Sequence, residues 1–295
     1  MNNILSEKEY QRFIIDKLVS ENGYIERKNV CFDRKFAIDR EMLFKFLDDT
    51  QPETMAQIRK VYKDVTEDTV VNFINTEITK AKSSLLSVLK HGVEIAGYKL
   101  DLMYTKPATT FNKDLLIKYN KNIFSVMEEV WASDTERIDL VIFLNGIAIF
   151  TFELKCNTSG QNYEDAIRQY KFERDYKTRL LKFKAGCLAH FAMDLNEVYM
   201  CTNLKGKSSF FLPFNKGCGV GIHSGKGNPH NENGINVSYM WEDILKKDTV
   251  LYLIDKIIFL QNTESAWPQQ HAGKQRAYYL GQMHLFGCQT KQFCK

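Results

Sequence analysis

The sequence predicts an α/β domain, and three features of its residue pattern support this class. Apolar residues recur at helical spacing through the first 90 residues, whereas later segments alternate apolar and polar residues as strands do. Near the centre, two strongly apolar runs flank the pair Asn145-Gly146, which is a strong signal for a β-hairpin. With 295 residues, of which 44% are hydrophobic, the chain can also bury a substantial core.

Helices are expected first, over residues 6–20, 40–62 and 66–90. Ser6 is a suitable N-cap for the first helix, because acidic residues follow it in the first turn. Strands are then expected over 93–104 and 122–132, followed by a hairpin over 137–155. The rest of the chain predicts a helix over 162–176, strands over 186–193, 197–203 and 209–214, a closing helix over 239–262 and a tail or linker over 263–295.

Composition narrows the functional classes. The formal net charge of +4 suits a polyanionic partner without requiring one. The seven cysteines include no Cys-x-x-Cys pair, so we expect reduced thiols rather than a disulfide framework or a cysteine-rich zinc site. The polar start and the lack of a long apolar run predict no secretory signal and no membrane span, which leaves the cytoplasm as the expected location.

The predicted hairpin carries a candidate catalytic site. Glu153 and Lys155 end its second strand and point the same way, because side chains alternate along a strand, and Asp139 lies near the start of the first strand. Two converging carboxylates repel each other unless a cation lies between them, and Mg²⁺ is the hard cation that such oxygen ligands prefer. A metal there could lower the pKa of a bound water, while a lysine could orient that water and stabilise charge on phosphorus.

The register of the hairpin decides whether this site can form. With Asn145-Gly146 as a two-residue loop, Asp139 opposes Phe152 and faces away from Glu153. A three-residue loop over 144–146, or a β-bulge that restores the same alternation, brings Asp139 to the face of Glu153 and Lys155. We predict this second arrangement. Taken alone, Glu-x-Lys is more often a solvated strand face, and the neighbouring acid, hairpin and helix favour the site.

These residues, in this order, resemble the PD-(D/E)XK nuclease superfamily, and more narrowly the N-terminal nuclease domain of the R subunit of type I restriction enzymes. The likeness covers roughly residues 1–262 and is carried by the stretches SEKEYQRFIIDKLVSENGY, RIDLVIFLNGIAIFTFELKCNTSGQNYEDAIRQYKFERD, FKAGCLAHFAMDLNEVYMCTNL, FFLPFNKG, GKGNP and SYMWEDIL. It implies a central mixed β-sheet flanked by helices, with a catalytic core at about 93–205 and an N-terminal helical part at 1–90. The proline of the superfamily name is replaced by Ile138.

The resemblance also implies roles for individual residues. Asp139 and Glu153 would bind the metal, and Lys155 would take the role of the catalytic lysine. The family's Gln-x-x-x-Tyr element on the following helix matches Gln169, but position 173 is Glu and the nearest tyrosine is Tyr170, which leaves the tyrosine role open. An acid on the first helix that assists the metal site would be Glu7 or Glu9. The basic residues of the helix after the hairpin are either DNA contacts or a solvated helix end, and they are Arg168, Lys171 and Arg174.

The implied activity is Mg²⁺-dependent cleavage of double-stranded DNA, with Mn²⁺ as a substitute, by a type I site-specific deoxyribonuclease. The implied partners are DNA and the specificity and modification subunits of a restriction complex. ATP would act only through a motor domain, which is absent from this sequence. Two alternatives remain: a DNA repair nuclease of the same superfamily, and a non-catalytic module of the same fold that docks to subunits or binds DNA.

Overall fold

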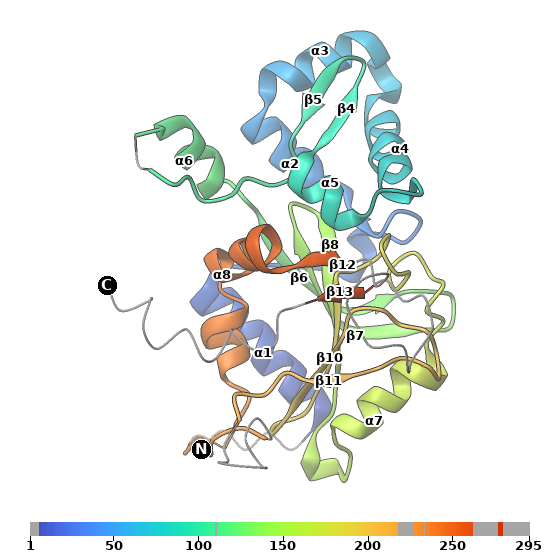
Figure 1. The fold of residues 1–295 in the computed structure, drawn as a ribbon, viewed down its shortest axis with the longest axis vertical. Coiled ribbons are helices and arrows are strands. Elements are labelled where there is room, and N and C mark those ends of the chain that lie inside the picture. The colour runs from blue at the N-terminus through green and yellow to red at the C-terminus, as the bar shows by residue number, and fades with distance from the viewer. Residues whose placement is uncertain (1–5, 110, 218–226, 233, 262–276, 280–295) are drawn as a thin grey trace.

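The computed structural model describes residues 6–109, 111–217, 227–232, 234–261 and 277–279, and its centre is a nine-stranded β-sheet (Figure 1). The strands of this sheet are β1 (Ile25–Arg27), β2 (Phe32–Asp33), β3 (Ile38–Asp39), β6 (Phe124–Trp131), β7 (Arg137–Leu144), β8 (Ile147–Leu154), β9 (Ala189–Met193), β10 (Val198–Cys201) and β11 (Leu212–Pro213).

The sheet is mixed. Along the order β1-β6-β7-β8-β9-β10-β11, the β1–β6 and β8–β9 pairs are parallel and the other neighbours are antiparallel. The short β2–β3 pair joins through β3, whose Ile38 pairs with Ile147 at the start of β8. The structure therefore confirms the α/β class and the central mixed sheet.

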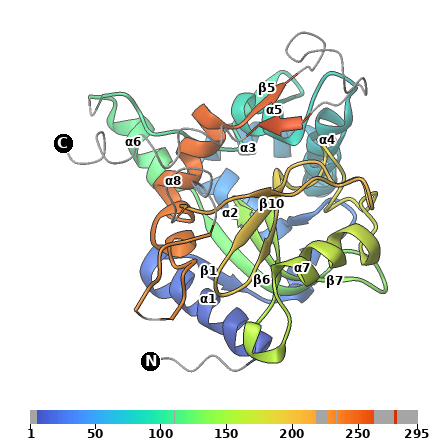
Figure 2. The ribbon, with the colours of Figure 1, turned by 60° about the horizontal axis from the view of Figure 1, so that its bottom comes forward.

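Helices cover both faces of the sheet (Figure 2). The α-helices are α1 (Glu7–Asn22), α2 (Arg40–Thr50), α3 (Pro52–Tyr62), α4 (Thr66–Thr79), α5 (Leu85–His91), α6 (Lys113–Asn120), α7 (Tyr163–Arg168) and α8 (Lys247–Tyr252). Shorter 3₁₀ segments are η1 (Asn29–Cys31), η2 (Lys63–Val65) and η3 (Asn157–Ser159), and π-helical segments are η4 (Gln169–Glu173), η6 (Met240–Ile244) and η7 (Leu253–Ile257).

Two hydrophobic clusters hold these layers together. The larger cluster joins α1, the helices α2–α5 and the segment from η6 to η7 to one face of the sheet, and it runs from Tyr10 to Ile258. The smaller cluster joins α7 and η4 to the opposite face, through Ala166 and Tyr170. Burying side chains from both faces of β7 and β8 explains why these strands are continuous apolar runs.

Several expected elements are broken by local residues. The expected helix 40–62 divides at Gln51, because Pro52 cannot continue a helix but fits the first position of the next. The helix 66–90 divides likewise, and Ser84 caps its second part, α5. The single strand expected at 93–104 is wrong: the chain turns at Ala96, and β4 (Val93–Ile95) pairs with β5 (Tyr98–Leu100) outside the main sheet.

The C-terminal part also differs. The helix expected at 162–176 ends at Glu173, after an α-helical and a π-helical part. In place of one closing helix over 239–262, the structure has three short helical segments, η6, α8 and η7, followed by the strand β12 (Phe259–Gln261). Within the expected tail, β13 (Ala277–Tyr279) pairs with β12; the rest of 263–295 lies outside the described residues, so its assignment as a tail stays a prediction.

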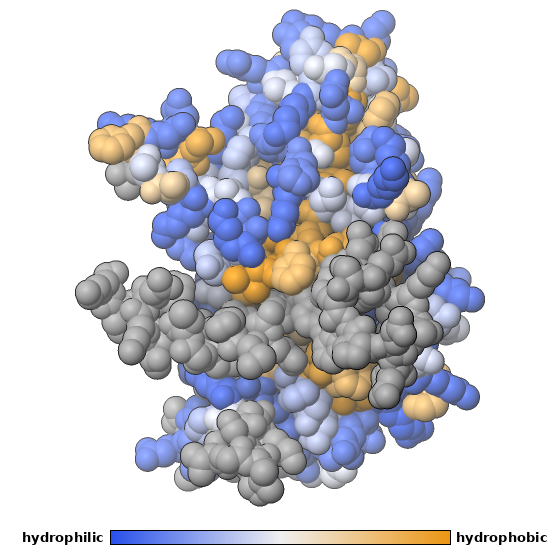
Figure 3. All heavy atoms as spheres, in the orientation of Figure 1, coloured by the Kyte–Doolittle hydropathy of each residue, from blue (hydrophilic) through white to orange (hydrophobic). Residues whose placement is uncertain are grey.

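The surface matches this packing. In Figure 3 the helices at the top turn mainly hydrophilic side chains outward, with apolar ones between them. None of the helices in the described part of the chain has the length and apolar character of a membrane span. The four described cysteines, Cys31, Cys156, Cys187 and Cys201, form no disulfide with one another.

Candidate active site

The candidate site lies at the end of the sheet where β7 begins and β8 ends. The β7–β8 turn is a two-residue loop, since Leu144 pairs with Ile147 and both loop residues have positive φ, 52° at Asn145 and 76° at Gly146. Positive φ at both positions is typical of a type I′ hairpin turn, which Asn-Gly favours. The three-residue loop that we considered is therefore wrong.

A β-bulge restores the alternation that the site needs. Phe143 pairs with Ala148, but Ile142 pairs with Phe150, so Ile149 is an extra residue on β8. Ile149 and Phe150 accordingly both pack into the larger cluster, although neighbours on a regular strand face opposite sides. The prediction of a compensating bulge is confirmed.

Beyond the bulge, the register brings the acids together. The pairs continue to Leu140 with Phe152, and extending this register by one residue sets Asp139 opposite Glu153. A hydrogen bond fixes this end of the hairpin, because the backbone N–H of Leu154 donates to Oδ2 of Asp139 over 2.7 Å. Both carboxylates thus lie on one face at the strand ends.

Helix α1 supports the site from the side. Nε2 of Gln11 donates to the backbone carbonyl of Asp139 over 2.9 Å. Nζ of Lys155 lies 2.9 Å from Oε2 of Glu7 and donates to the carbonyl of Leu154 at the same distance. Of the two acids considered on this helix, the structure brings Glu7 to the site through Lys155.

Arg174 makes the closest charged contact with Glu153. Its Nε lies 2.7 Å from Oε1 and its Nη2 lies 3.2 Å from Oε2, so the guanidinium binds both carboxylate oxygens. The Glu153 side chain is fully buried, and the Arg174 side chain is only 11% exposed. Such a bidentate pair fixes both geometry and charge.

Burial dominates the electrostatics. Desolvation raises the pKa of Asp139 to about 6, while the charge of Lys155 and the Leu154 hydrogen bond oppose the rise. Desolvation, together with the negative charge of Asp139, raises the pKa of Glu153 well above its usual value, and Arg174 opposes this. The acids therefore lie close together in a dry environment, where the charges of Lys155 and Arg174 only partly offset the cost of burying them.

A chain of polar groups lies behind the acids on the same face. The hydroxyls of Thr151 and Tyr170 lie 2.8 Å apart, and the Thr151 hydroxyl is also 2.8 Å from Nδ1 of His190. All three side chains are buried, and burial lowers the pKa of His190 to about 3, so its imidazole is neutral. Tyr170 thus has a packing and hydrogen-bonding role next to Glu153.

The residues present fit a magnesium ion of the kind that proteins hold with few ligands. Among the described residues, no group of three or more His, Cys, Asp or Glu side chains gathers as a metal cluster. Mg²⁺ is nevertheless usually bound through one or two carboxylates, with water and substrate phosphate completing its shell. Asp139 and Glu153, two buried acids whose pKa values are both raised by desolvation, match this donor set.

The other predicted site residues lie at different depths. Gln169 begins η4, and its Oε1 is buried without a hydrogen-bond partner in the described structure. Arg168 is 68% exposed and pairs loosely with Glu173, and Lys171 is half-buried. Arg174 was expected either at a solvated helix end or in contact with DNA, and both positions are on the outer surface. Its side chain is instead largely buried against Glu153.

Sequence reasoning missed the pairing of Arg174 with Glu153 and the Thr151–Tyr170–His190 chain. Arg174 and Glu153 are 21 positions apart, a separation that follows no strand or helix period, so no pattern links them. The hydroxyl chain joins β8, η4 and β9, and such contacts follow only from the three-dimensional packing.

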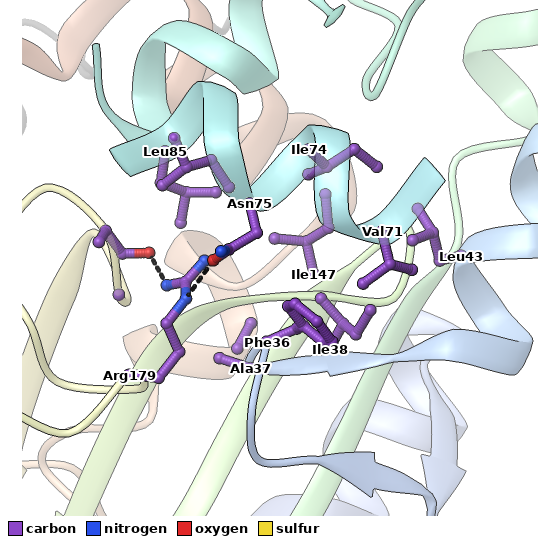
Figure 4. Close-up of a pocket in the computed structure, with 14 residues that line it drawn as sticks. Phe36, Ala37, Ile38, Leu43, Val71, Ile74, Asn75, Leu85, Ile147 and Arg179 are labelled. Carbon is purple, nitrogen blue, oxygen red and sulfur yellow. Dashed lines mark hydrogen bonds between the residues drawn. The ribbon is translucent and has the colours of Figure 1, made fainter. Parts of the chain in front are cut away.

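A separate small cavity does not provide an alternative site (Figure 4). It lies between α4 and the β3–β8 edge, is lined mainly by apolar side chains such as Phe36 and Ile147, and has room for about one water at about 10 Å³. Arg179 at its rim donates to Oδ1 of Asn75 and to the carbonyl of Ala185. No carboxylate lines it, so it lacks the groups for metal binding.

Comparison with known families adds a direct finding. The family described as Type I restriction enzyme R protein N terminus matches residues 4–209. This range contains α1, the β7–β8 hairpin, α7 and η4, and so every residue of the site described above. A search of curated proteins gives no significant match.

Proposed function

Because the chain belongs to the family of type I restriction enzyme R protein N termini, we propose that it cleaves double-stranded DNA with Mg²⁺ as its cofactor. Mn²⁺ should replace Mg²⁺, since both are hard cations with oxygen ligands. The chain would act as the nuclease part of an R subunit, as a phosphodiester hydrolase of the type I site-specific deoxyribonuclease class.

The observation that supports this proposal is the gathering of two carboxylates and one ammonium at the end of a paired strand. Asp139, Glu153 and Lys155 are 8%, 0% and 5% exposed, which excludes a solvated strand face. Burying three charged groups together is costly, and perturbed groups of this kind gather at functional sites. A DNA repair nuclease of the same fold would use the same groups, and the family match favours restriction.

The contacts support a proposed role for each residue. Asp139 and Glu153 would hold the metal, which when bound polarises the phosphodiester and lowers the pKa of its water. Lys155 would turn from Glu7 toward the scissile phosphate and stabilise negative charge there. Gln169, with its buried and unpartnered Oε1, would orient the helix side of the site or contact DNA.

DNA would approach beside the N-terminus of α1 and across η4. Glu7 is 36% exposed, so the site meets solvent at the Lys155–Glu7 pair. Basic side chains beside η4 can contact phosphates: Arg168 and Lys171 on the helix, and Lys207 over the ring of Phe172 at 5.8 Å. Because phosphate contacts carry no sequence information, target recognition would lie with other subunits.

Those subunits would be the specificity and modification chains of a type I complex, which we propose as partners with DNA. ATP would act only through the motor domain of an R subunit. We expect the complex to work in the cytoplasm, where thiols such as Cys156 stay reduced.

The proposal is tested by measuring the nicking of supercoiled plasmid by the whole chain, with Mg²⁺ or Mn²⁺ at about 10 mM so that the metal is in excess over the protein. Lys155→Ala should lower the nicking rate by at least ~100-fold, because it removes the positive group that meets the reacting phosphate. Lys45→Ala is the matched control, since this lysine makes only an exposed pair with Asp49 on α2.

Equal rates for the unchanged chain and Lys155→Ala would remove this lysine from the mechanism. Calorimetric titration with Mn²⁺ provides the second measurement, in which Asp139→Asn and Glu153→Gln should each abolish binding. A chain that neither nicks DNA nor binds Mn²⁺ through these acids would instead be a non-catalytic docking module.

A further inference from the structure

The bond between Arg174 and Glu153 has a consequence for metal binding. Both Glu153 oxygens accept from the guanidinium, at 2.7 and 3.2 Å, and the Glu153 side chain has no exposed area. A metal therefore cannot reach these oxygens from solvent while Arg174 keeps its position. Arg174 follows η4 directly and has an extended backbone, with φ −112° and ψ 130°, so it starts a new segment of chain.

Charge explains why an arginine takes this place. Asp139 and Glu153 bring two negative charges into a buried space, and the ammonium of Lys155 is directed at Glu7. Arg174 interacts electrostatically with both Asp139 and Glu153. It therefore supplies, in the absence of metal, the positive charge that the two acids need.

We propose that Arg174 is the counter-cation of the metal-free site, and that metal binding displaces it from Glu153. The inference rests on the proposed metal role of Asp139 and Glu153, and it makes Arg174 a positioning residue that competes with the metal. The two cations compete because they need the same carboxylate oxygens and the same negative charge.

The segment after Arg174 is tied down in a way that can follow such a movement. The backbone N–H of Asp175 donates to Glu136 in the β6–β7 turn over 3.0 Å, and Asp175 accepts from the N–H of Lys177. These exposed bonds can exchange with water at little cost. Displacing Arg174 would therefore need local movement only, and would place a guanidinium at the site where a DNA phosphate arrives.

If Arg174 competes with the metal, replacing it should raise the affinity for Mn²⁺, whereas replacing a purely structural ion pair should not. Arg174→Gln removes the competing charge, so Mn²⁺ should bind at least ~10-fold tighter than to the unchanged chain, equivalent to about 1.4 kcal/mol. The same variant should melt at a lower temperature in EDTA, because the acids lose their counter-charge, and should gain more from added Mn²⁺. Arg174→Lys keeps the charge but not the bidentate contact, so its affinity for Mn²⁺ should lie between those of the unchanged chain and Arg174→Gln.

The measurement is calorimetric titration of the whole chain with MnCl₂, without DNA, together with melting in EDTA and in Mn²⁺. Arg59→Gln is the matched control, because it breaks an equally bidentate pair, with Asp48 at 2.7 and 2.8 Å, between α3 and α2. It should leave the Mn²⁺ affinity unchanged.

The Mn²⁺ affinities of the Arg174 and Glu153 variants decide between the possible results. Unchanged or weaker Mn²⁺ binding in both Arg174→Gln and Arg174→Lys would overturn the inference, and Arg174→Lys alone decides if Arg174→Gln fails to fold. Glu153→Gln separates the two proposals: if Mn²⁺ binds equally well without this acid, the proposed metal site itself is wrong. If Glu153→Gln abolishes binding while the Arg174 variants bind no more tightly, only the role of Arg174 is wrong.

Discussion

Replacing Asp139 by asparagine should make the metal-free protein more stable, and the structure gives the size of this effect. In the folded chain burial raises the Asp139 pKa from 3.8 to about 6. Each pKa unit corresponds to ~1.36 kcal/mol, so the ionised group costs the folded state about 3 kcal/mol at neutral pH. Asparagine keeps an acceptor for the Leu154 N–H and removes the charge.

The pH dependence of this cost has a definite sign. The unfolded chain releases the Asp139 proton near pH 4, whereas the folded chain holds it until about pH 6. Between these values the folded state binds more protons, so the free energy of unfolding falls as the pH rises from about 4 to 6. Asp139→Asn loses this decline, and its advantage should be full at pH 8 and small at pH 4.

Urea denaturation in EDTA at pH 8 and pH 4.5 measures the difference. We expect Asp139→Asn to be more stable at pH 8 by about 1–3 kcal/mol, with the gap narrowing at the lower pH. Asp134→Asn, at an 88% exposed position paired with Arg34, should differ from the unchanged chain by less than ~0.5 kcal/mol at both pH values. If Asp139→Asn is no more stable than the unchanged chain at pH 8, the reasoning on burial is refuted.

Two further predictions concern the scaffold. Asn145→Ala should lower the free energy of unfolding by about 3 kcal/mol or more, because the fully buried amide accepts from the N–H of Ile123 and donates to the carbonyl of Leu102. Urea denaturation measures this loss, and a change below ~1 kcal/mol would contradict the prediction. The imidazole of His190, bonded to Thr151, should stay neutral at every pH at which the protein is folded, since burial lowers its pKa to about 3. Because the unfolded chain protonates this histidine near pH 6.5 and the folded chain does not, the free energy of unfolding should fall as the pH falls below 6.5. A ring ¹⁵N NMR titration of the folded protein with a midpoint near 6.5 would disprove the neutral state of His190.

The sequence was informative where local chemistry decides the structure. Asn145-Gly146 predicted the hairpin because two consecutive positive φ angles favour these residues. The Glu-x-Lys spacing predicted that Glu153 and Lys155 share a face. It could not place the bulge, because Ile149 differs in no visible way from its apolar neighbours, and only the joint packing of Ile149 and Phe150 against the larger cluster selects its position.

Contacts between distant segments were beyond the sequence. Arg174 was expected on a solvated or DNA-facing helix surface, but η4 ends at Glu173 and the chain turns the guanidinium toward Glu153. The strand expected at 93–104 alternated as a long strand would, yet Ala96 and Gly97 adopt positive φ and fold it into a separate hairpin. In the first case tertiary packing overrode a local periodicity, and in the second a tight turn interrupted it.

The extra residue at Ile149 sets a rule for how this hairpin can change in length. Removing Ile149 would abolish the bulge and still leave Glu153 opposite Asp139, because Phe143 with Ala148 and Ile142 with Phe150 would then be consecutive pairs of a regular hairpin. Removing a second residue between the turn and Glu153 would shift the alternation, and would transfer Glu153 and Lys155 to the opposite side of β8, into the apolar layer that includes α1. A deletion in this arm should therefore be compatible with a working trio when it removes the extra residue alone.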